Sequence, residues 1–163
     1  NIMSSFAHRV LARFSVFVFA TLFAALLPIA SMAQVNKDLP VVDLTIKNSK
    51  LKAEVAADMN TRTVGLMNRF SLKPDTGMIF VFAESQPLGF WMKNTFVSLS
   101  IAYIDRDGVI INILDMKAHD ETAHPSAGPA LYALEMKQGW FKERGIVAGD
   151  KVLGLEKAGK AKN

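Results

Sequence analysis

Cysteine is absent from the 163 residues of this sequence. Thiol catalysis, zinc-thiolate sites and disulfide exchange are therefore excluded, and in an oxidising compartment the fold has to be stabilised by its hydrophobic core. The sequence also lacks a serine in a Gly-x-Ser-x-Gly elbow and a glycine-rich phosphate loop, which are common signatures of hydrolases and nucleotide-binding proteins. Internal repeats and low-complexity tracts are missing as well.

Positive charge is not gathered into a stripe. The 19 lysines and arginines exceed the 15 acidic residues by four, but Arg9 and Arg13 lie in the N-terminal segment and several lysines lie in the tail Lys157–Lys162. The rest of the chain is nearly neutral and has no dense basic run with interleaved aromatics. The composition therefore argues against nucleic-acid binding.

The N-terminal segment has the layout of a secretory signal. His8, Arg9 and Arg13 form a basic region, Phe14–Leu27 is apolar, and small residues occupy the −3 and −1 positions that end at Ala33. This pattern predicts a signal peptide over residues 1–33, cleaved after Ala33, and hence a periplasmic or secreted protein without membrane contact after cleavage. The alternative is an uncleaved anchor, although the apolar run is short for a membrane span.

The remaining chain fits one domain. We expect a flexible lead-in over residues 34–40, a single β-rich domain over 41–156 and a solvated basic tail over 157–163. Alternation and turn signals predict strands over 42–46, 51–55, 78–82, 90–103, 109–114, 131–136 and 151–155, and helices over 58–69 and 138–144. Short strands with only two brief helices favour a mainly β fold, an antiparallel jelly-roll-like sandwich or barrel.

One polar group interrupts an apolar stretch at the centre of the chain. Trp91, Lys93, Asn94 and Thr95 combine a flat apolar surface, a cation and hydrogen-bonding groups, as in sites for small polar molecules such as sugars. Glu135, between two apolar strand residues, is the natural partner of Lys93. In the alternative interpretation the indole is core, the lysine extends to solvent and Asn94 and Thr95 satisfy a bulge or an edge.

The segment Lys117–Ala130 is polar, broken by prolines and unusually long for a loop in a compact domain. It contains His119 and His124, which are five residues apart and precede a proline, so they do not match the helical zinc-protease motif. A looser metal site with Met116 is a weak candidate, and two solvated loop histidines are the simpler interpretation. The sequence predicts no cofactor.

Three segments resemble the bacterial and archaeal family called domain of unknown function 192: Gly65–Phe82, Phe90–Asp105 and Gly128–Val152. The resemblance implies a compact β-rich domain, often behind a secretion signal, and it implies no activity. The residues that match the family's motifs are Gly65, Leu66, Met67, Arg69, Gly77, Met78, Trp91, Met92, Lys93, Asn94 and Thr95.

Three functions remain open at this point. The first is a periplasmic binding or accessory module for a small polar ligand or an envelope protein, using Trp91–Thr95, the loop histidines and Glu135. The second is a hydrolase or lyase in which His119 or His124 acts with Lys93 or Glu135. The third is a metal carrier using the histidines and Met116. A decisive feature is whether Lys117–Ala130 folds over the face that carries Lys93 and Asn94.

Overall fold

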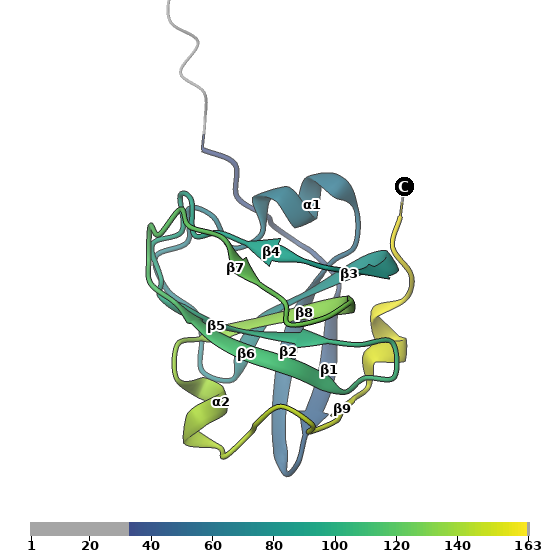
Figure 1. The fold of residues 1–163 in the computed structure, drawn as a ribbon. Coiled ribbons are helices and arrows are strands. Elements are labelled where there is room, and N and C mark those ends of the chain that lie inside the picture. Colours follow the sequence, from purple (N-terminus) through teal and green to yellow (C-terminus); the bar gives the residue numbers. More distant parts are fainter. Residues whose placement is uncertain (1–32, 163) are drawn as a thin grey trace, which may run out of the picture. The chain divides into compact units, whose positions relative to one another are not determined.

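The computed structural model describes residues 33–162, so the predicted signal peptide lies outside the described residues except for Ala33. Seven strands form one curled sheet in the order β6-β5-β8-β3-β2-β1-β9, and two short strands form a separate ribbon, β4-β7 (Figure 1). The strands are β1 (Val41–Ile46), β2 (Ser49–Ala56), β3 (Thr76–Gln86), β4 (Gly89–Phe90), β5 (Leu99–Ile104), β6 (Ile110–Met116), β7 (His124–Pro125), β8 (Ala130–Lys137) and β9 (Val152–Leu153). The helices are α1 (Met59–Val64), α2 (Trp140–Glu143) and a 3-10 turn, η1 (Leu155–Ala158).

The mainly β class with two short helices is confirmed. Neighbouring strands pair antiparallel, with one exception: β2 and β3 are parallel, and Ala53 lies opposite Gly77. This pair is parallel because α1 and the turn after it carry the chain back to the starting end of β2 before β3 begins. No helix within residues 33–162 is long and apolar enough to cross a membrane.

The two ends of the curled sheet are joined. An isolated bridge connects Val109, at the start of β6, to Lys151, just before β9. The Ile110 amide donates to the Asp150 carbonyl at 2.9 Å, and the Val152 amide donates to the Gly108 carbonyl at 2.8 Å. The curled sheet is therefore a half-barrel whose ends meet through a short contact, which leaves fewer unpaired strand edges than an open sheet would.

Apolar residues pack on both faces of the sheet. The inner face carries Leu44, Ile46 and Leu134, and α2 adds Trp140 and Phe141 to this core. On the outer face, Met78, Phe80, Ile101 and Tyr103 form a second core with Leu66 and Met92. Strand β5, expected to be half-buried, is buried along its whole length. The reason is that α1 and the β4-β7 ribbon cover the outer face, which alternation within one strand cannot indicate.

The expected strand over 90–103 begins nine residues late. After Phe90 the chain leaves the ribbon and turns: the Thr95 amide donates to the Met92 carbonyl at 3.1 Å, and Asn94 has φ +52°. Met92 donates its amide to the Asp120 carbonyl at 2.7 Å. The alternation of apolar and polar residues over 90–95 therefore reflects a turn in which Met92 and Thr95 are buried.

Three other boundaries differ from expectation. Strand β3 continues to Gln86, through part of the segment expected to be a loop. Helix α1 ends at Val64, five residues earlier than expected, because the backbone of Gly65 (φ +48°) leaves the helical region. The tail is partly packed, because Ala158 is buried and the Lys162 amide donates to the Ala57 carbonyl at 2.8 Å.

Candidate functional site

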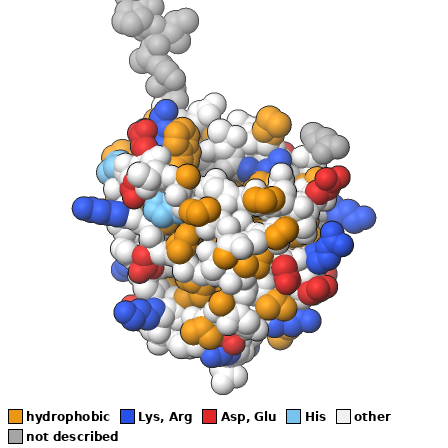
Figure 2. Space-filling view, viewed as in Figure 1, with side chains coloured by type: hydrophobic (Ala, Val, Ile, Leu, Met, Phe, Trp, Pro, Cys, Tyr) orange, Lys and Arg blue, Asp and Glu red, His pale blue; other side chains and the backbone are white. Residues whose placement is uncertain are grey.

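A cavity of about 320 Å³ lies on the outer face of the sheet, between α1 with its following turn and the strands β3, β4 and β8. Hydrophobic side chains are spread over the face shown in Figure 2, and the histidines lie toward one side of it. The lining combines one acid, one guanidinium, four aromatic rings and a few small or apolar groups. These residues are Met59, Arg62, Thr63, Val64, Gly65, Leu66, Met67, Phe80, Phe82, Gly89, Phe90, Trp91, Thr95 and Glu135.

Glu135 lies in the middle of the sheet, on β8, at the floor of this cavity. Met78 of β3 and Ile101 of β5 are its neighbours on either side. Only 4% of the residue is exposed, and its carboxyl group takes part in none of the side-chain hydrogen bonds or ion pairs found within residues 33–162. No fully sealed side-chain oxygen of those residues lacks a partner, so the carboxyl oxygens of Glu135 open into the cavity that the residue lines. Burial raises the pKa of Glu135 to about 8, because the charged form is separated from water.

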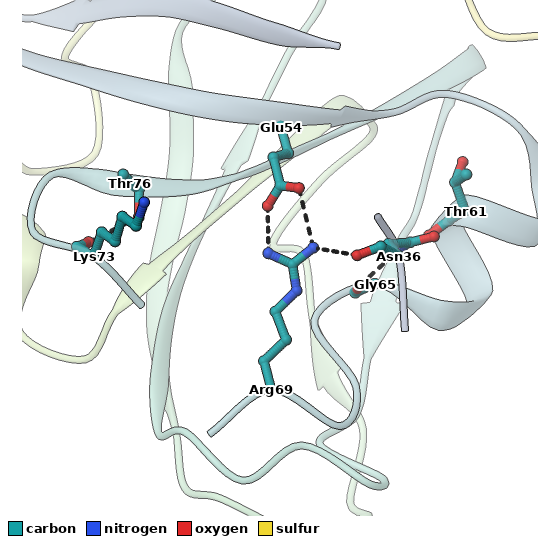
Figure 3. A network of polar contacts seen from close by, with 7 residues as sticks. All are labelled: Asn36, Glu54, Thr61, Gly65, Arg69, Lys73 and Thr76. Carbon is teal, nitrogen blue, oxygen red and sulfur yellow. Dashed lines mark hydrogen bonds and ion pairs between the residues drawn. The ribbon is translucent and has the colours of Figure 1, made fainter. Parts of the chain in front are cut away.

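A second glutamate on the same row of the sheet is paired. Glu54 of β2 lies opposite Met78, which itself lies opposite Glu135. Figure 3 shows Arg69 reaching Glu54 with both terminal nitrogens, the longer contact being 3.1 Å, and also donating to the Asn36 carbonyl at 2.9 Å. The same face therefore contains one neutralised carboxylate and one without a partner among the described residues.

Asn36 ties the expected lead-in to the end of α1. Its side-chain amide donates to the carbonyls of Thr61 and Gly65 at 2.9 and 3.0 Å (Figure 3). The Thr61 carbonyl also accepts the Gly65 amide at 2.9 Å, whereas the Gly65 carbonyl lies just past the end of the helix. Asp58 caps the other end of α1 by accepting from the Thr61 amide at 2.8 Å. Side-chain hydrogen bonds therefore fix both ends of the helix that borders the cavity.

Aromatic rings form much of the cavity wall. Phe90 packs edge-on against Phe80, with the centroids 4.9 Å apart, and against Phe82 at 6.4 Å. Its ring also meets Tyr103 at 5.9 Å. Tyr103 donates its hydroxyl to the His124 carbonyl, and its pKa is raised by burial and by the nearby Glu135. Ring packing therefore fixes the wall, and Tyr103 connects the floor to the long loop.

Arg62 is the one cation of the lining, and it is held by backbone groups. Its Nη1 donates to the carbonyls of Ala57 and Val81 at 2.8 and 3.1 Å, and its guanidinium lies 5.2 Å from the centroid of Phe82. Among the described residues it pairs with no acid. Arg62 thus places positive charge on the α1 side of the cavity.

The four residues predicted at 91–95 separate in the structure. Trp91 and Thr95 line the cavity, and the Trp91 side is open to solvent, with 49% of that residue exposed. Lys93 lies outside, with its Nζ 5.1 Å from the centroid of Trp91. The expected Lys93–Glu135 ion pair is absent from the described residues, because the turn at Asn94 directs this segment to the surface. Asn94 is exposed, and its carbonyl accepts the Asn68 amide.

The long loop runs beside the central segment rather than over Lys93 and Asn94. Strand β7 pairs with β4, so that His124 lies opposite Phe90, and the His119 amide donates to the Thr95 carbonyl at 3.1 Å. The ring of His119 packs edge-on against Phe96. His124 contacts Asp120, Nε2 to Oδ2 at 3.5 Å. Neither histidine lines the cavity.

The candidate metal ligands do not come together. Met116 is fully buried in the outer core, while His119 is exposed. Over the span 33–162, no group of three His, Asp or Glu side chains has an arrangement that could hold a metal ion.

Sequence reasoning missed Arg62, Phe82 and Phe90 as lining residues. Arg62 lies within the predicted helix, and Phe80 and Phe82 share a face of the predicted strand, so a signal was present for each separately. What the sequence did not show is that α1 and the turn after it lie against the part of the sheet near Val81 and Phe82. This placement forms the cavity that Glu135 lines.

Fold and cavity together define a small, mainly β domain, built on a curled half-barrel sheet, with a candidate ligand site on the outer face of that sheet. The chain belongs to the family DUF192, described as an uncharacterised ACR family, whose model matches residues 42–154. A crystal structure from Sinorhizobium meliloti 1021, described as a candidate transcription regulator, is 32% identical over 74% of this chain and 98% of that chain, with a TM-score of 0.71.

A second crystal structure, a protein of unknown function from Novosphingobium aromaticivorans DSM 12444, is also 32% identical. It covers 74% of this chain and 89% of that chain, with a TM-score of 0.66. A search of curated proteins finds no match. Both structural relatives therefore share the fold over most of their length, and the family carries no defined activity to transfer.

Proposed function

We propose that this protein is an exported binding module that holds a small ligand in the cavity between α1 and the sheet. The observation that carries the proposal is the carboxyl group of Glu135, which is nearly completely buried and faces the cavity without a partner among the described residues. A buried acid costs stability unless a partner compensates it. A ligand that enters the cavity would be that partner.

The dimensions and lining of the cavity support a small-molecule ligand. Its volume of about 320 Å³ lies at the lower end of the range for small-molecule pockets, roughly 300–1,000 Å³. Aromatic walls with few polar groups are typical of such sites. The ligand would present an apolar body to Phe80, Phe82 and Phe90 and a polar group to Glu135.

The hydrolase or lyase alternative has less support. It requires His119 or His124 to act with Lys93 or Glu135, and only Glu135 of these four lines the cavity. A DNA-binding role, by analogy with the description of the S. meliloti protein, also has little support. A recognition helix must present several residues to the major groove, whereas α1 and α2 contain six and four residues.

The indole N–H resonances provide a direct binding test, because the chain has two tryptophans. Trp91 lines the cavity, whereas Trp140 donates its indole N–H to Asp75 at 2.9 Å on the opposite side of the sheet. We expect that titration with a library of amines, acids, saccharides and nucleosides shifts the Trp91 resonance for at least one class and leaves Trp140 unchanged. If no compound moves Trp91, the proposed function is wrong.

A further inference from the structure

The proposed function leaves the class of ligand open, and the charges around the cavity narrow it. Resting on that function, we propose that the cavity binds a primary monoamine with an apolar body, and that the ammonium group sits against the carboxylate of Glu135. The aromatic rings of the wall would surround the apolar body. Three features support this ligand class: the carboxylate without a cationic partner among the described residues, the aromatic rings beside it, and the one cation of the lining, Arg62.

The first step compares the two glutamates of one row. Glu54 and Glu135 lie on the same face of the sheet, separated by Met78. The chain supplies Glu54 with a bidentate arginine, Arg69. Glu135 is more deeply buried than Glu54, yet no Lys or Arg side chain within residues 33–162 pairs with it. A cationic ligand in the cavity would neutralise Glu135 as Arg69 neutralises Glu54.

The second step concerns the rings near the acid. Phe80 and Tyr103 lie diagonal to Glu135, because both face Ala133, two residues before it on β8. Diagonal neighbours on one face are roughly 7–8 Å apart, within reach of aromatic side chains. Ring faces attract ammonium groups, most strongly where water is excluded. A carboxylate surrounded by rings therefore favours an amine over a neutral or anionic polar group.

The third step concerns Arg62. Its guanidinium is held on the α1 side by the carbonyls of Ala57 and Val81. A second ammonium at the far end of a ligand would meet this like charge in a site of low polarity, where repulsion is strong. The arrangement therefore selects against diamines and favours a single cationic end.

Binding of the amine would release a proton. The free carboxyl group is protonated below its pKa of about 8, so the step is carboxylic acid plus ammonium ion giving a carboxylate–ammonium pair and one proton to solvent. The charged or titratable groups facing this site are Tyr103 from β5, Arg62 from α1 and the Glu54–Arg69 pair beyond Met78. Amine affinity should fall about tenfold per pH unit below about 8.

The test compares probes of one shape and three charges: 2-phenylethylamine, 2-phenylethanol and phenylacetate. Dissociation constants are measured at pH 6 and pH 8 and constant ionic strength in amine-free buffer, from the Trp91 indole shift. We expect the amine to bind most tightly, with affinity roughly 50-fold higher at pH 8 than at pH 6. The alcohol should show no such dependence, and 1,4-diaminobutane should bind more weakly than n-butylamine.

Two variants distinguish the effect of the Glu135 charge on ligand affinity from the effect of the cavity's shape. Glu135→Gln keeps the shape of the side chain and should abolish the pH dependence and lower amine affinity at pH 8 at least 20-fold. Glu84→Gln, at an exposed glutamate of β3 outside the lining, should behave like the wild type.

The two proposals fail differently. If the alcohol or phenylacetate shifts Trp91 as strongly as the amine, or if Glu135→Gln binds the amine normally, the cavity is a ligand site and the amine inference is overturned. If none of the probes and no member of the wider library shifts Trp91, the binding function itself is rejected.

Discussion

At the scale of single residues, Glu135 is the least expected feature of the chain. A glutamate in a central strand would ordinarily be paired or replaced by an apolar residue, because burial of an acid without a partner is unfavourable. Its neighbours Met78 and Ile101 provide no hydrogen bond. The protein therefore keeps a destabilising group at the floor of a cavity, which is typical of functional sites.

The raised pKa of Glu135 predicts a pH-dependent stability difference. In the unfolded chain the group ionises near 4.5 and in the folded protein near 8, so between these values the folded state holds one more proton and loses stability as pH rises. The free energy of unfolding of Glu135→Gln should therefore increase, relative to that of the wild type, by on the order of 1 kcal/mol per pH unit between the two pKa values. Above the higher pKa the difference should stay constant.

Urea denaturation of both proteins from pH 4 to pH 9 measures this difference, and other titrating groups cancel in the comparison. Glu84→Gln, at an exposed position, should run parallel to the wild type. Parallel curves for Glu135→Gln as well would show that the carboxyl group is not held in its neutral form by burial.

At the scale of elements, the short helix α1 determines whether the cavity exists. It has only six residues and begins at a capping box in which Asp58 and Thr61 satisfy each other's backbone amides. Its C-cap residue is Gly65, which lines the cavity together with Phe80. A helix this short has little stability of its own, so its position depends on the cap, on Asn36 and on packing against the sheet.

Gly65→Ala should destabilise the protein by about 2–3 kcal/mol, because two penalties combine. The backbone has φ +48°, and an added Cβ would lie 3.3 Å from Cζ of Phe80. Gly145→Ala is the matched control: its φ is +61°, but no atom lies within 4 Å of the added Cβ, so it should cost only about 1 kcal/mol.

Chemical denaturation gives both free energies of unfolding, and the Trp91 indole resonance should move in Gly65→Ala but not in Gly145→Ala. Equal costs for the two variants would mean that contact between α1 and the sheet at Phe80 is looser than the structure shows.

At the scale of the whole molecule, a thiol-free half-barrel whose ends meet at the Val109–Lys151 bridge needs no disulfides. Its two cores, one inside the curled sheet and one outside, together bury enough apolar surface for a domain of this size. Such a fold suits an oxidising compartment, where cysteines would be liable to oxidation.

Export predicts a defined mature N-terminus. Expressed in a bacterial host as the full chain, the protein should appear in the periplasmic or culture fraction, with an intact mass that corresponds to a chain beginning at Gln34. Ala33→Arg should block cleavage, because signal peptidase sites require a small residue at −1. Ala33→Ser keeps a small side chain and should be processed normally.

Cell fractionation and intact-mass spectrometry of the three proteins check this prediction. A cytosolic protein that retains residues 1–33 would contradict export. A processed Ala33→Arg protein would place the cleavage site elsewhere.

Local sequence patterns predict some elements of this protein correctly and others not. The strands predicted over 42–46, 51–55 and 109–114 and the helix predicted over 138–144 lie within a few residues of β1, β2, β6 and α2, because each prediction depends on neighbouring residues. The strand expected over 90–103 was wrong over residues 91–98, because alternation cannot distinguish a strand from a turn with buried side chains. Glu135 was singled out correctly as unusual, but its proposed partner Lys93 lies at the surface.

By itself the sequence determined the β-rich class, the absence of thiol chemistry and the positions of most strands along the chain. These follow from composition and from periodicity over a few residues. Only the tertiary structure decided that α1 borders a cavity on the outer face, that β5 is covered on both sides and that Glu135 lies in that aromatic cavity without a cationic partner among the described residues. Each of these depends on contacts between segments distant in the chain, where packing rather than local preference selects the arrangement.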